Sequence, residues 1–433
     1  VGDEAFFASL NKYLTDHRFG TGEVHQLRLA FEAVTGQDLN WFFNQWYLSK
    51  GHPVLDISYA YDAVKKEETV TIYQLQDTYD GTPVFRLPLN IDVYEGGKKT
   101  RYARIVTEAN QEFTFSCATM PDLVNVEADK VLVCEKTDNK SDTAFAFQLD
   151  HAPLFMDRLE ALYFFSENTL SPFYEQVMLR GMNDRSPAIR LASLEGVRLI
   201  DVEDAGGLLK KKITALAMAD SSSLVRATAM EKMAGWNDPA VTTILENGLR
   251  DSSYTVISTA LQAMVEVDSV KAYTAAQVLE RDSADEVLRG LTAVYARMAG
   301  PEKNNFFLRQ LDGTDLSYNT TVSYGQYLSR WPENKEVVES ALPLLYNISE
   351  KNPAWYVRLA ATNSLENLYS AMDERKETYT NKLVQDELSA DDKRSLTSAI
   401  EWLDHQMKAI AQKVGAIKAA ETNENLKLMY GLK

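Results

Sequence analysis

Cysteine and histidine are scarce in this sequence, and long apolar runs are missing. Only two cysteines, Cys117 and Cys134, occur among 433 residues. Two cysteines cannot form a disulfide framework, although a single bridge between neighbouring strands stays open. No window approaches the roughly 18 to 20 apolar residues that cross a bilayer. The sequence therefore predicts no membrane span and a fold held by buried apolar surface.

Positive charge is also in short supply. Lys and Arg number 45 against 62 Asp and Glu, which gives a formal net charge of -17. Proteins that bind a phosphate backbone need clustered Lys and Arg to displace counterions, so nucleic acid is excluded as an expected partner. The length of 433 residues allows two or three domains, each with its own core.

Residues 1–52 have helical periodicity and are rich in aromatic side chains. Thr21 and Asp38 are candidate caps of a second and a third helix, and Gly36 is expected to end the second. Ten of the 44 aromatic residues of the chain lie in the first 50 positions. Three short helices cannot enclose so many rings, so we expect most of them to face a partner, and the segment to be a site of self-association.

Residues 53–138 change to short alternating segments typical of strands. Glu95-Gly96-Gly97 predicts a hairpin, and Asp80-Gly81 predicts a similar one earlier. About seven strands in this length predict a small β-sandwich. The clearest segments are 54–61, 69–76, 84–94, 99–107 and 111–117.

Residues 139–433 are helical and contain a repeated motif. A capping Asp or Asn precedes a helix whose Arg comes six or seven residues later, as at Arg190, Arg226 and Arg358. The pattern resembles HEAT repeats, in which paired helices stack and each repeat packs only against its neighbours. The fold class is therefore multidomain and mainly α, with a HEAT-like solenoid. The motif begins at Asp184, Asp220, Asp251, Asp282 and Asn352.

The residues that usually carry catalysis do not form a recognisable site. No histidine belongs to an H-E-x-x-H pattern, which would place two imidazoles on one metal ion. The sequence has no G-x-S-x-G elbow, and both cysteines lie in strand-like apolar runs. We therefore predict no catalytic residue, no metal ligand and no cofactor, and leave the substrate-binding residues unassigned. The histidines are His17, His25, His52, His151 and His405.

A specific resemblance lies in residues 35–53. There Gly36-x-Asp38-Leu39 leads into the aromatic run Phe42-Phe43-x-x-Trp46, and Gly51-His52-Pro53 follows. This order closely resembles the end of the thermolysin-like catalytic domain in the aminopeptidase N family of gluzincin zinc metallopeptidases. The resemblance implies that 1–52 are the last catalytic-domain helices, 53–138 a sandwich and 139–433 the helical domain.

In that family the intact enzyme removes N-terminal residues from peptides with a zinc ion bound by H-E-x-x-H, and a G-x-M-E-N strand binds the substrate amine. Neither motif occurs here, so the resemblance implies a C-terminal portion that shapes and caps the active-site cleft. Zinc, the upstream catalytic domain and peptide substrates are expected in the intact protein only. An arginine of the helical domain contacts substrate in some family members, but the repeat positions of Arg190, Arg226 and Arg358 favour packing.

An interpretation from another class stays open. Helical repeats commonly present protein-binding surfaces, and the same family has noncatalytic members that serve as scaffolds. Intact H-E-x-x-H and G-x-M-E-N motifs upstream would indicate the enzyme, and degraded ones the scaffold.

Overall fold

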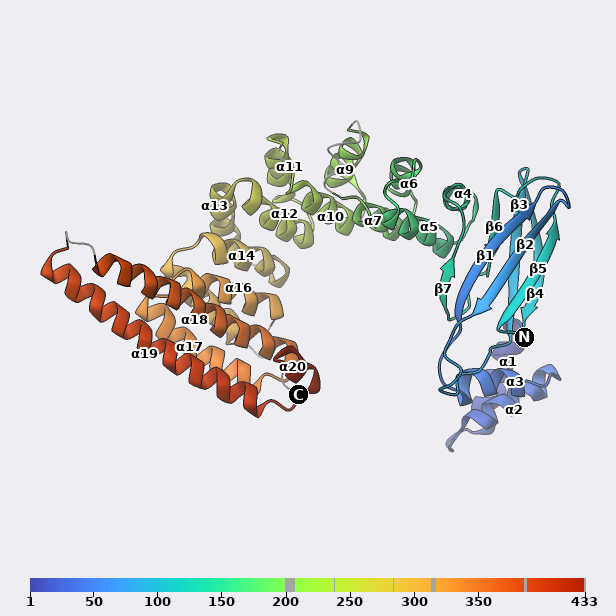
Figure 1. Ribbon diagram of the computed structural model, residues 1–433, viewed down its shortest axis with the longest axis horizontal. Helices are drawn as coiled ribbons and strands as arrows, with labels where there is room; N and C mark the ends of the chain where they lie inside the picture. The colour runs from blue at the N-terminus through green and yellow to red at the C-terminus, as the bar shows by residue number, and fades with distance from the viewer. Residues whose placement is uncertain (199–206, 237, 283, 313–316, 385–387, 432–433) are drawn as a thin grey trace. The chain divides into compact units, whose positions relative to one another are not determined.

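The computed structural model describes residues 1–198, 207–236, 238–282, 284–312, 317–384 and 388–431. The chain is mostly helical, with seven strands between the first helices and a long helical region (Figure 1). It divides into two compact units, Val1–Val197 and Arg198–Lys433.

The first unit begins with short helices. Gly36 ends the second helix in the left-handed conformation, as predicted. Its start differs from the prediction, because Glu23 and Gln26 form a capping box and Thr21 lies outside the helix. The N-cap of the third helix is Leu39 and not Asp38 as predicted, although Asp38 Oδ1 accepts a hydrogen bond from the Asn40 backbone N–H at 2.9 Å. The elements are α1 (Asp3–Asp16), α2 (Val24–Thr35), α3 (Asn40–Phe43) and the π-helical turn η1 (Asn44–Leu48).

Seven strands form two sheets. One has the order β5-β2-β1-β7 and the other β4-β3-β6. All neighbours are antiparallel except β1 and β7, which pair in parallel over Val54–Ile57 and Glu135–Asp138. The bounds are β1 (Val54–Asp62), β2 (Glu67–Gln74), β3 (Leu87–Glu95), β4 (Lys98–Val106), β5 (Asn110–Ser116), β6 (Leu123–Val126) and β7 (Glu135–Asp138).

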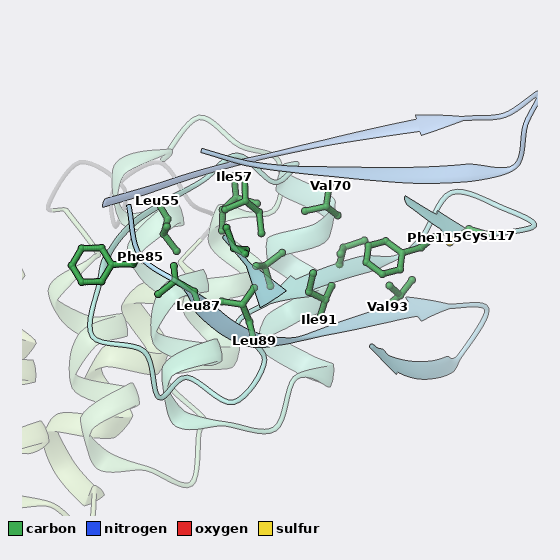
Figure 2. Packing of buried hydrophobic residues seen from close by; sticks show 14 residues of the cluster. Leu55, Ile57, Val70, Phe85, Leu87, Leu89, Ile91, Val93, Phe115 and Cys117 are labelled. Atoms are coloured by element: carbon green, nitrogen blue, oxygen red, sulfur yellow. The ribbon is translucent and has the colours of Figure 1, made fainter. Parts of the chain in front are cut away.

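The two sheets share one hydrophobic core (Figure 2). Strand alternation accounts for it, since every second side chain points to the same face. In β2, for example, Val70 and Ile72 are fully buried while Tyr73 between Ile72 and Gln74 is exposed. Phe85 joins the same core from the segment before β3.

Turn chemistry was predicted correctly at one hairpin and wrongly at another. Glu95 faces Lys98 in the β3–β4 pair, so Gly96 and Gly97 form the predicted turn. The turn at Asp80-Gly81 does not make a hairpin, because β2 and β3 belong to different sheets. A local turn motif predicts that the chain changes direction. It does not predict which sheet the next strand joins.

Four helices complete the first unit. Ser141 caps the first of them by accepting a hydrogen bond from the backbone N–H of Ala144. Tyr94 and Leu123 of the second sheet pack with Ala152 and Phe147 near the end of this helix, so helix and sheet share apolar surface. The helices are α4 (Asp142–His151), α5 (Phe155–Glu167), α6 (Tyr174–Gly181) and α7 (Pro187–Glu195).

The second unit is helical throughout its described residues. Alternate helices pack on one another in the series α10, α12, α14, α16 and α18, and α19 packs on α18. The bounds are α9 (Leu208–Ala219), α10 (Ser223–Met233), α11 (Ala240–Gly248), α12 (Tyr254–Val267), α13 (Ser269–Leu279), η2 (Glu280–Asp282), α14 (Asp285–Met298), η3 (Pro301–Lys303), α15 (Asn304–Leu311), α16 (Tyr318–Ser329), α17 (Lys335–Lys351), α18 (Trp355–Leu383), α19 (Ala390–Ala420) and α20 (Glu424–Met429).

Glycine at two helix contacts explains how closely some of these helices approach. A Cβ on Gly290 of α14 would lie 2.9 Å from the carbonyl oxygen of Ser258 in α12. A Cβ on Gly325 of α16 would lie 2.3 Å from the hydroxyl of Ser364 in α18. Contact at these points therefore requires a residue without a side chain.

Candidate functional site

The helices of residues 1–52 bury few of their own apolar side chains. Phe31, Leu39 and Phe43 form a small core between α1, α2 and α3. Phe7 of α1 remains two-thirds exposed and Phe19 almost fully exposed. We call the exposed set the N-terminal apolar surface. It consists of Phe6, Phe7, Leu14, Phe19, Leu29, Val34, Phe42, Tyr47 and Leu48.

Two neighbouring side chains of η1 fix this helical segment to the sheets. The Gln45 amide accepts from the backbone N–H of Arg86 at 2.9 Å and donates to its carbonyl at 3.0 Å. The ring of Trp46 lies 5.1 Å from that of Phe85, measured between centroids. Because Gln45 is buried, losing both bonds would leave its amide unpaired.

A groove of about 950 Å³ lies beside this junction. Its walls come from α3, η1, β3, β4 and the segment 127–133, and aromatic rings dominate one side. The guanidinium of Arg86 lies 4.9 Å from the ring centroid of Trp41, within the range of a cation–π contact. Val131 and Val133 of the opposite wall are largely exposed.

The acidic side chains of the groove are already engaged. Glu127 accepts hydrogen bonds from the backbone N–H groups of Val131 and Leu132. Asp129 accepts from Arg101 at 2.7 Å and from Asn90 at 2.7 Å. The groove is therefore suited to packing against apolar surface and provides no acid–base pair for catalysis.

A buried ionic network joins the sheets to α5. Lys130 and Lys136 each bind the carboxylate of Glu160, at 2.8 and 2.7 Å. Lys140 binds Asp138 at 2.6 Å, and the Tyr59 hydroxyl donates to the same carboxylate at 2.7 Å. Burial alone would raise the pKa of Asp138, but the ammonium groups of Lys140 and Lys136 lower it below its ordinary value. The network is paired and therefore structural.

His52 and His151 make separate structural contacts. The Nε2 atom of His52 is 2.8 Å from the Glu135 carboxylate, which ties the start of β1 to the start of β7. His151 stacks on the ring of Phe147 at 3.9 Å. Within the described residues, no group of three or more His, Cys, Asp or Glu side chains could hold a metal ion. None of the described helices has the length and apolarity to cross a bilayer.

Both cysteines are free thiols next to the core of the sheets. The bridge that the sequence left open is therefore not formed in this structure. Burial raises the pKa of both Cys117 and Cys134 above the ordinary thiol value. A thiol with a raised pKa is a poor nucleophile, so neither cysteine is a candidate for covalent chemistry.

The three repeat arginines all bond to the carbonyl six residues earlier. Arg190 donates to Asp184 at 2.9 Å, Arg226 to Asp220 at 2.8 Å and Arg358 to Asn352 at 2.8 Å. These contacts agree with the predicted packing role. The repeat that begins at Asp251 departs from the pattern, since Ile257 stands at its sixth position.

The repeat carboxylates and amide lie just before the helix that follows, but they are not its N-cap as predicted, since Ser186, Ser222, Ser253 and Ala354 hold that position. Asp184, Asp220 and Asp251 each accept from the backbone N–H two residues later, at 2.7, 2.8 and 2.8 Å, and Asn352 does the same at 2.9 Å. Satisfying an otherwise unpaired N–H at a helix start explains the residue type. The Asp282 side chain lies outside the described residues.

Sequence reasoning missed the groove and the ionic network. Lys130, Lys136 and Glu160 are far apart in the sequence and carry no motif, so their contact depends on how β7 and α5 meet. A buried acid in β2 was missed as well. Glu68 shares the parity of Val70 and Ile72 in this strand, and that alternation was a signal that it points inward.

No family model matches the chain, but several known proteins are similar to it in sequence. The chain is 32% identical over 102 residues to tricorn protease-interacting factor F2 of Thermoplasma acidophilum and 30% over 99 residues to its namesake in Thermoplasma volcanium. These alignments cover 23% and 22% of the chain and 12% of each relative. Similarity to Escherichia coli aminopeptidase N is 22% over 309 residues, covering 67% of the chain and 33% of that protein.

The fold resembles that of Legionella pneumophila aminopeptidase A in complex with aspartic acid. The TM-score is 0.56 with 14% identity, and the match covers 94% of the chain and 55% of that structure. The chain thus has an aminopeptidase-like fold and is similar in sequence to aminopeptidase N. It spans about an eighth to a half of the lengths of the proteins it matches.

Proposed function

We propose that this chain is the C-terminal region of a zinc aminopeptidase that removes N-terminal residues from peptides. In this proposal the region shapes and caps the active-site cleft and has no activity alone. The main support is the fold likeness to aminopeptidase A, which covers 94% of the chain. The aromatic pattern of residues 35–53 supports the same relationship independently.

The proposed domains follow the resemblance. Residues 1–52 would complete a thermolysin-like catalytic domain, 53–138 would be a β-sandwich and 139–433 a HEAT-like solenoid. Support for the sandwich comes from two sheets with a common core. Support for the solenoid comes from the alternate packing of α10 to α18 and from the repeated hydrogen bonds of Asp220 and Asp251 before successive helices.

Zinc does not fit the described residues. They contain no group of three or more potential ligands, whereas a catalytic zinc ion needs three protein ligands and an open position. We therefore assign the zinc ion, and every catalytic step, to the upstream catalytic domain of the intact protein.

The N-terminal apolar surface is the proposed contact with that domain. Phe7, Phe19 and Leu14 are exposed on the same short helical segment that resembles the end of the catalytic domain. Covering them would remove apolar area from water, which favours association. The same surface would produce self-association of the separate chain.

An aminopeptidase assay tests the proposal. This chain and the same chain extended upstream through its gene are incubated with zinc and an amino-acid amide that reports cleavage. We expect cleavage by the extended protein only, and metal analysis should find no stoichiometric zinc on the shorter chain. One tightly held zinc per short chain, or cleavage by it, would contradict the proposal.

One observation favours a second candidate. Two of the similar proteins are named as factors that interact with tricorn protease, although the matched part is 12% of each. A noncatalytic helical-repeat scaffold for protein–protein interaction is the alternative function. The scaffold function is favoured if the extended protein does not cleave the amino-acid amide but binds a defined protein partner.

A further inference from the structure

An acidic side chain is buried in the first unit without a partner. Glu68 of β2 is 4% exposed, and no hydrogen bond or ion pair to its carboxylate occurs among the described residues. The register explains its position. Glu68 lies opposite Tyr61 of β1 and opposite Phe115 of β5, and it shares the inward face of β2 with Val70.

A cavity of about 360 Å³ opens beside this carboxylate. Tyr59 and Tyr61 line it from β1, and the first residues of α4 close one side. Apolar side chains line another part of the wall, among them Leu123 and Met120, of which Met120 is exposed at the rim. The cavity thus combines one acid, two aromatic rings and apolar walls.

Three hydrogen-bond donors along the wall already have acceptors elsewhere. The Tyr59 hydroxyl donates to Asp138 at 2.7 Å and the Tyr61 hydroxyl donates to the carbonyl of Cys117 at 3.2 Å. The Asn139 amide donates to the Asp56 carboxylate and the Ile57 carbonyl. The free acceptors of the wall are the Glu68 carboxylate and the second lone pairs of the phenols, beside the Lys140 ammonium and the hydroxyls of Ser141 and Thr143, which line the same cavity.

The other charged groups near the cavity do not neutralise Glu68. The Lys140 ammonium lines the same cavity but is held by Asp138 at 2.6 Å. Glu95 adds negative charge near Tyr61 and Cys117. Burial raises the pKa of Glu68 to about 7, so the carboxylate is ionised at pH 8 and largely protonated at pH 6.

We propose that this cavity binds a primary ammonium group carried on a short aliphatic arm. An ammonium has three donors and no acceptor, which complements the free Glu68 carboxylate and the phenol oxygens of the wall. Its charge pairs with Glu68, aromatic rings favour a cation, and the arm packs on apolar side chains. A metal ion fits poorly because Glu68 is a single carboxylate, outside any group of three potential ligands in the described residues.

Two sources share this chemistry, a lysine side chain of a peptide and a free alkylamine. The probes are Nα-acetyl-lysinamide for the first and n-butylamine for the second. Nα-acetyl-norleucinamide has the same peptide backbone without the charge and serves as the neutral control. Binding of the lysinamide but not of butylamine assigns the site to peptides, and the reverse assigns it to free amines.

The full chain with ¹³C-methyl-labelled methionine gives a local readout at Met120. At pH 8 we expect a saturable shift of this methyl signal with an ammonium probe and none with the norleucine control. Lowering the pH to 6 should weaken binding about tenfold, since a group with a pKa near 7 loses about nine-tenths of its charge. The pH dependence requires no variant, so it tests the site even if a variant fails to fold.

Glu68→Gln should weaken binding by at least about tenfold, the effect of losing one charge-assisted hydrogen bond. Glu67→Gln is the matched control, because Glu67 is the neighbour on the opposite face of the same strand. Absence of a saturable shift in the wild type, equal binding of the norleucine control, or undiminished binding by Glu68→Gln overturns the proposal. These readouts are independent of peptide hydrolysis, so the site and the proposed aminopeptidase role can fail separately.

Discussion

Arg226 donates two hydrogen bonds to the carboxylate of Asp251, at 2.8 and 2.7 Å, and a third to the carbonyl of Asp220. Asp251 occupies in the next repeat the position that Asp220 has in its own. One guanidinium therefore joins the starts of two successive repeats, α10 and α12. The hydrogen bonds from Arg226 are the largest cause of the lowered pKa of Asp251.

Replacing Arg226 should destabilise the second unit. Arg226→Ala removes three hydrogen bonds at a largely buried pair, and we expect a loss of about 2 to 3 kcal/mol in the free energy of unfolding. Arg297→Ala is the control, because the Arg297–Glu266 pair is half-exposed and should contribute less than about 1 kcal/mol. Equal effects of both variants in urea unfolding would contradict the structural role of the repeat arginine.

The buried network around Glu160 predicts a stronger effect in the first unit. Glu160→Gln leaves Lys130 and Lys136 without their shared carboxylate, so we expect a loss of about 3 kcal/mol at pH 7. Burial opposes the charge of Glu160, but the two ammonium groups lower its pKa overall. Its contribution is therefore present above the unfolded pKa and is lost as pH falls through the folded one.

Thermal unfolding between pH 3 and pH 7 checks this assignment. The difference between wild type and Glu160→Gln should shrink as the solution becomes acidic. Glu112→Gln, at an exposed position of β5, should change stability by less than about 0.5 kcal/mol at any pH. A stability difference that grows toward acid pH would show that folding does not lower the pKa of Glu160.

Glu68 predicts the opposite pH dependence. Its folded pKa of about 7 lies above the ordinary 4.5, so between these values the folded chain binds more protons than the unfolded one. Stability must then fall as pH rises through this window. Glu68→Gln removes the buried charge, and we expect it to stabilise the chain by about 1 to 3 kcal/mol at pH 8 and by little at pH 4. Denaturant unfolding at pH 8 and pH 4 tests this prediction. An equal change in stability at the two pH values would contradict it.

The N-terminal apolar surface predicts self-association of the separate chain. Sedimentation velocity should show an average mass that rises with concentration, and Phe7→Ser combined with Leu14→Ser should reduce the rise. Val270→Ser with Val278→Ser, at exposed positions of α13, is the matched control and should leave it unchanged. A strict monomer with strong hydrogen-exchange protection of α1 would count against this surface as a contact.

Local patterns predicted the local structure well. Gly36 ends α2, as predicted, because a left-handed helix end is decided by a single residue. Asp80-Gly81 was misread because which sheet takes the next strand depends on contacts far along the chain. Sequence periodicity thus reports local conformation, and tertiary pairing decides the rest.

The candidate sites were less predictable than the fold. Aromatic density predicted the exposed rings of residues 1–52, since Phe7 and Phe19 have no core large enough to cover them. The ammonium cavity combines Glu68 of β2 with residues near α4, and no spacing in the sequence connects them. Such sites form where elements that are distant in the sequence pack together. One sequence alone does not show which elements do so.

The parallel pairing of β1 with β7 has a consequence for the order of folding. Of these seven strands, β1 leaves the ribosome first and β7 last, and they are neighbours in one sheet. The sheet therefore stays open along β1 until residues 135–138 have been synthesised. The helical repeats that follow are built from local contacts, which form faster than distant strand pairs. During translation the nascent chain thus carries an unpaired strand edge until β7 arrives.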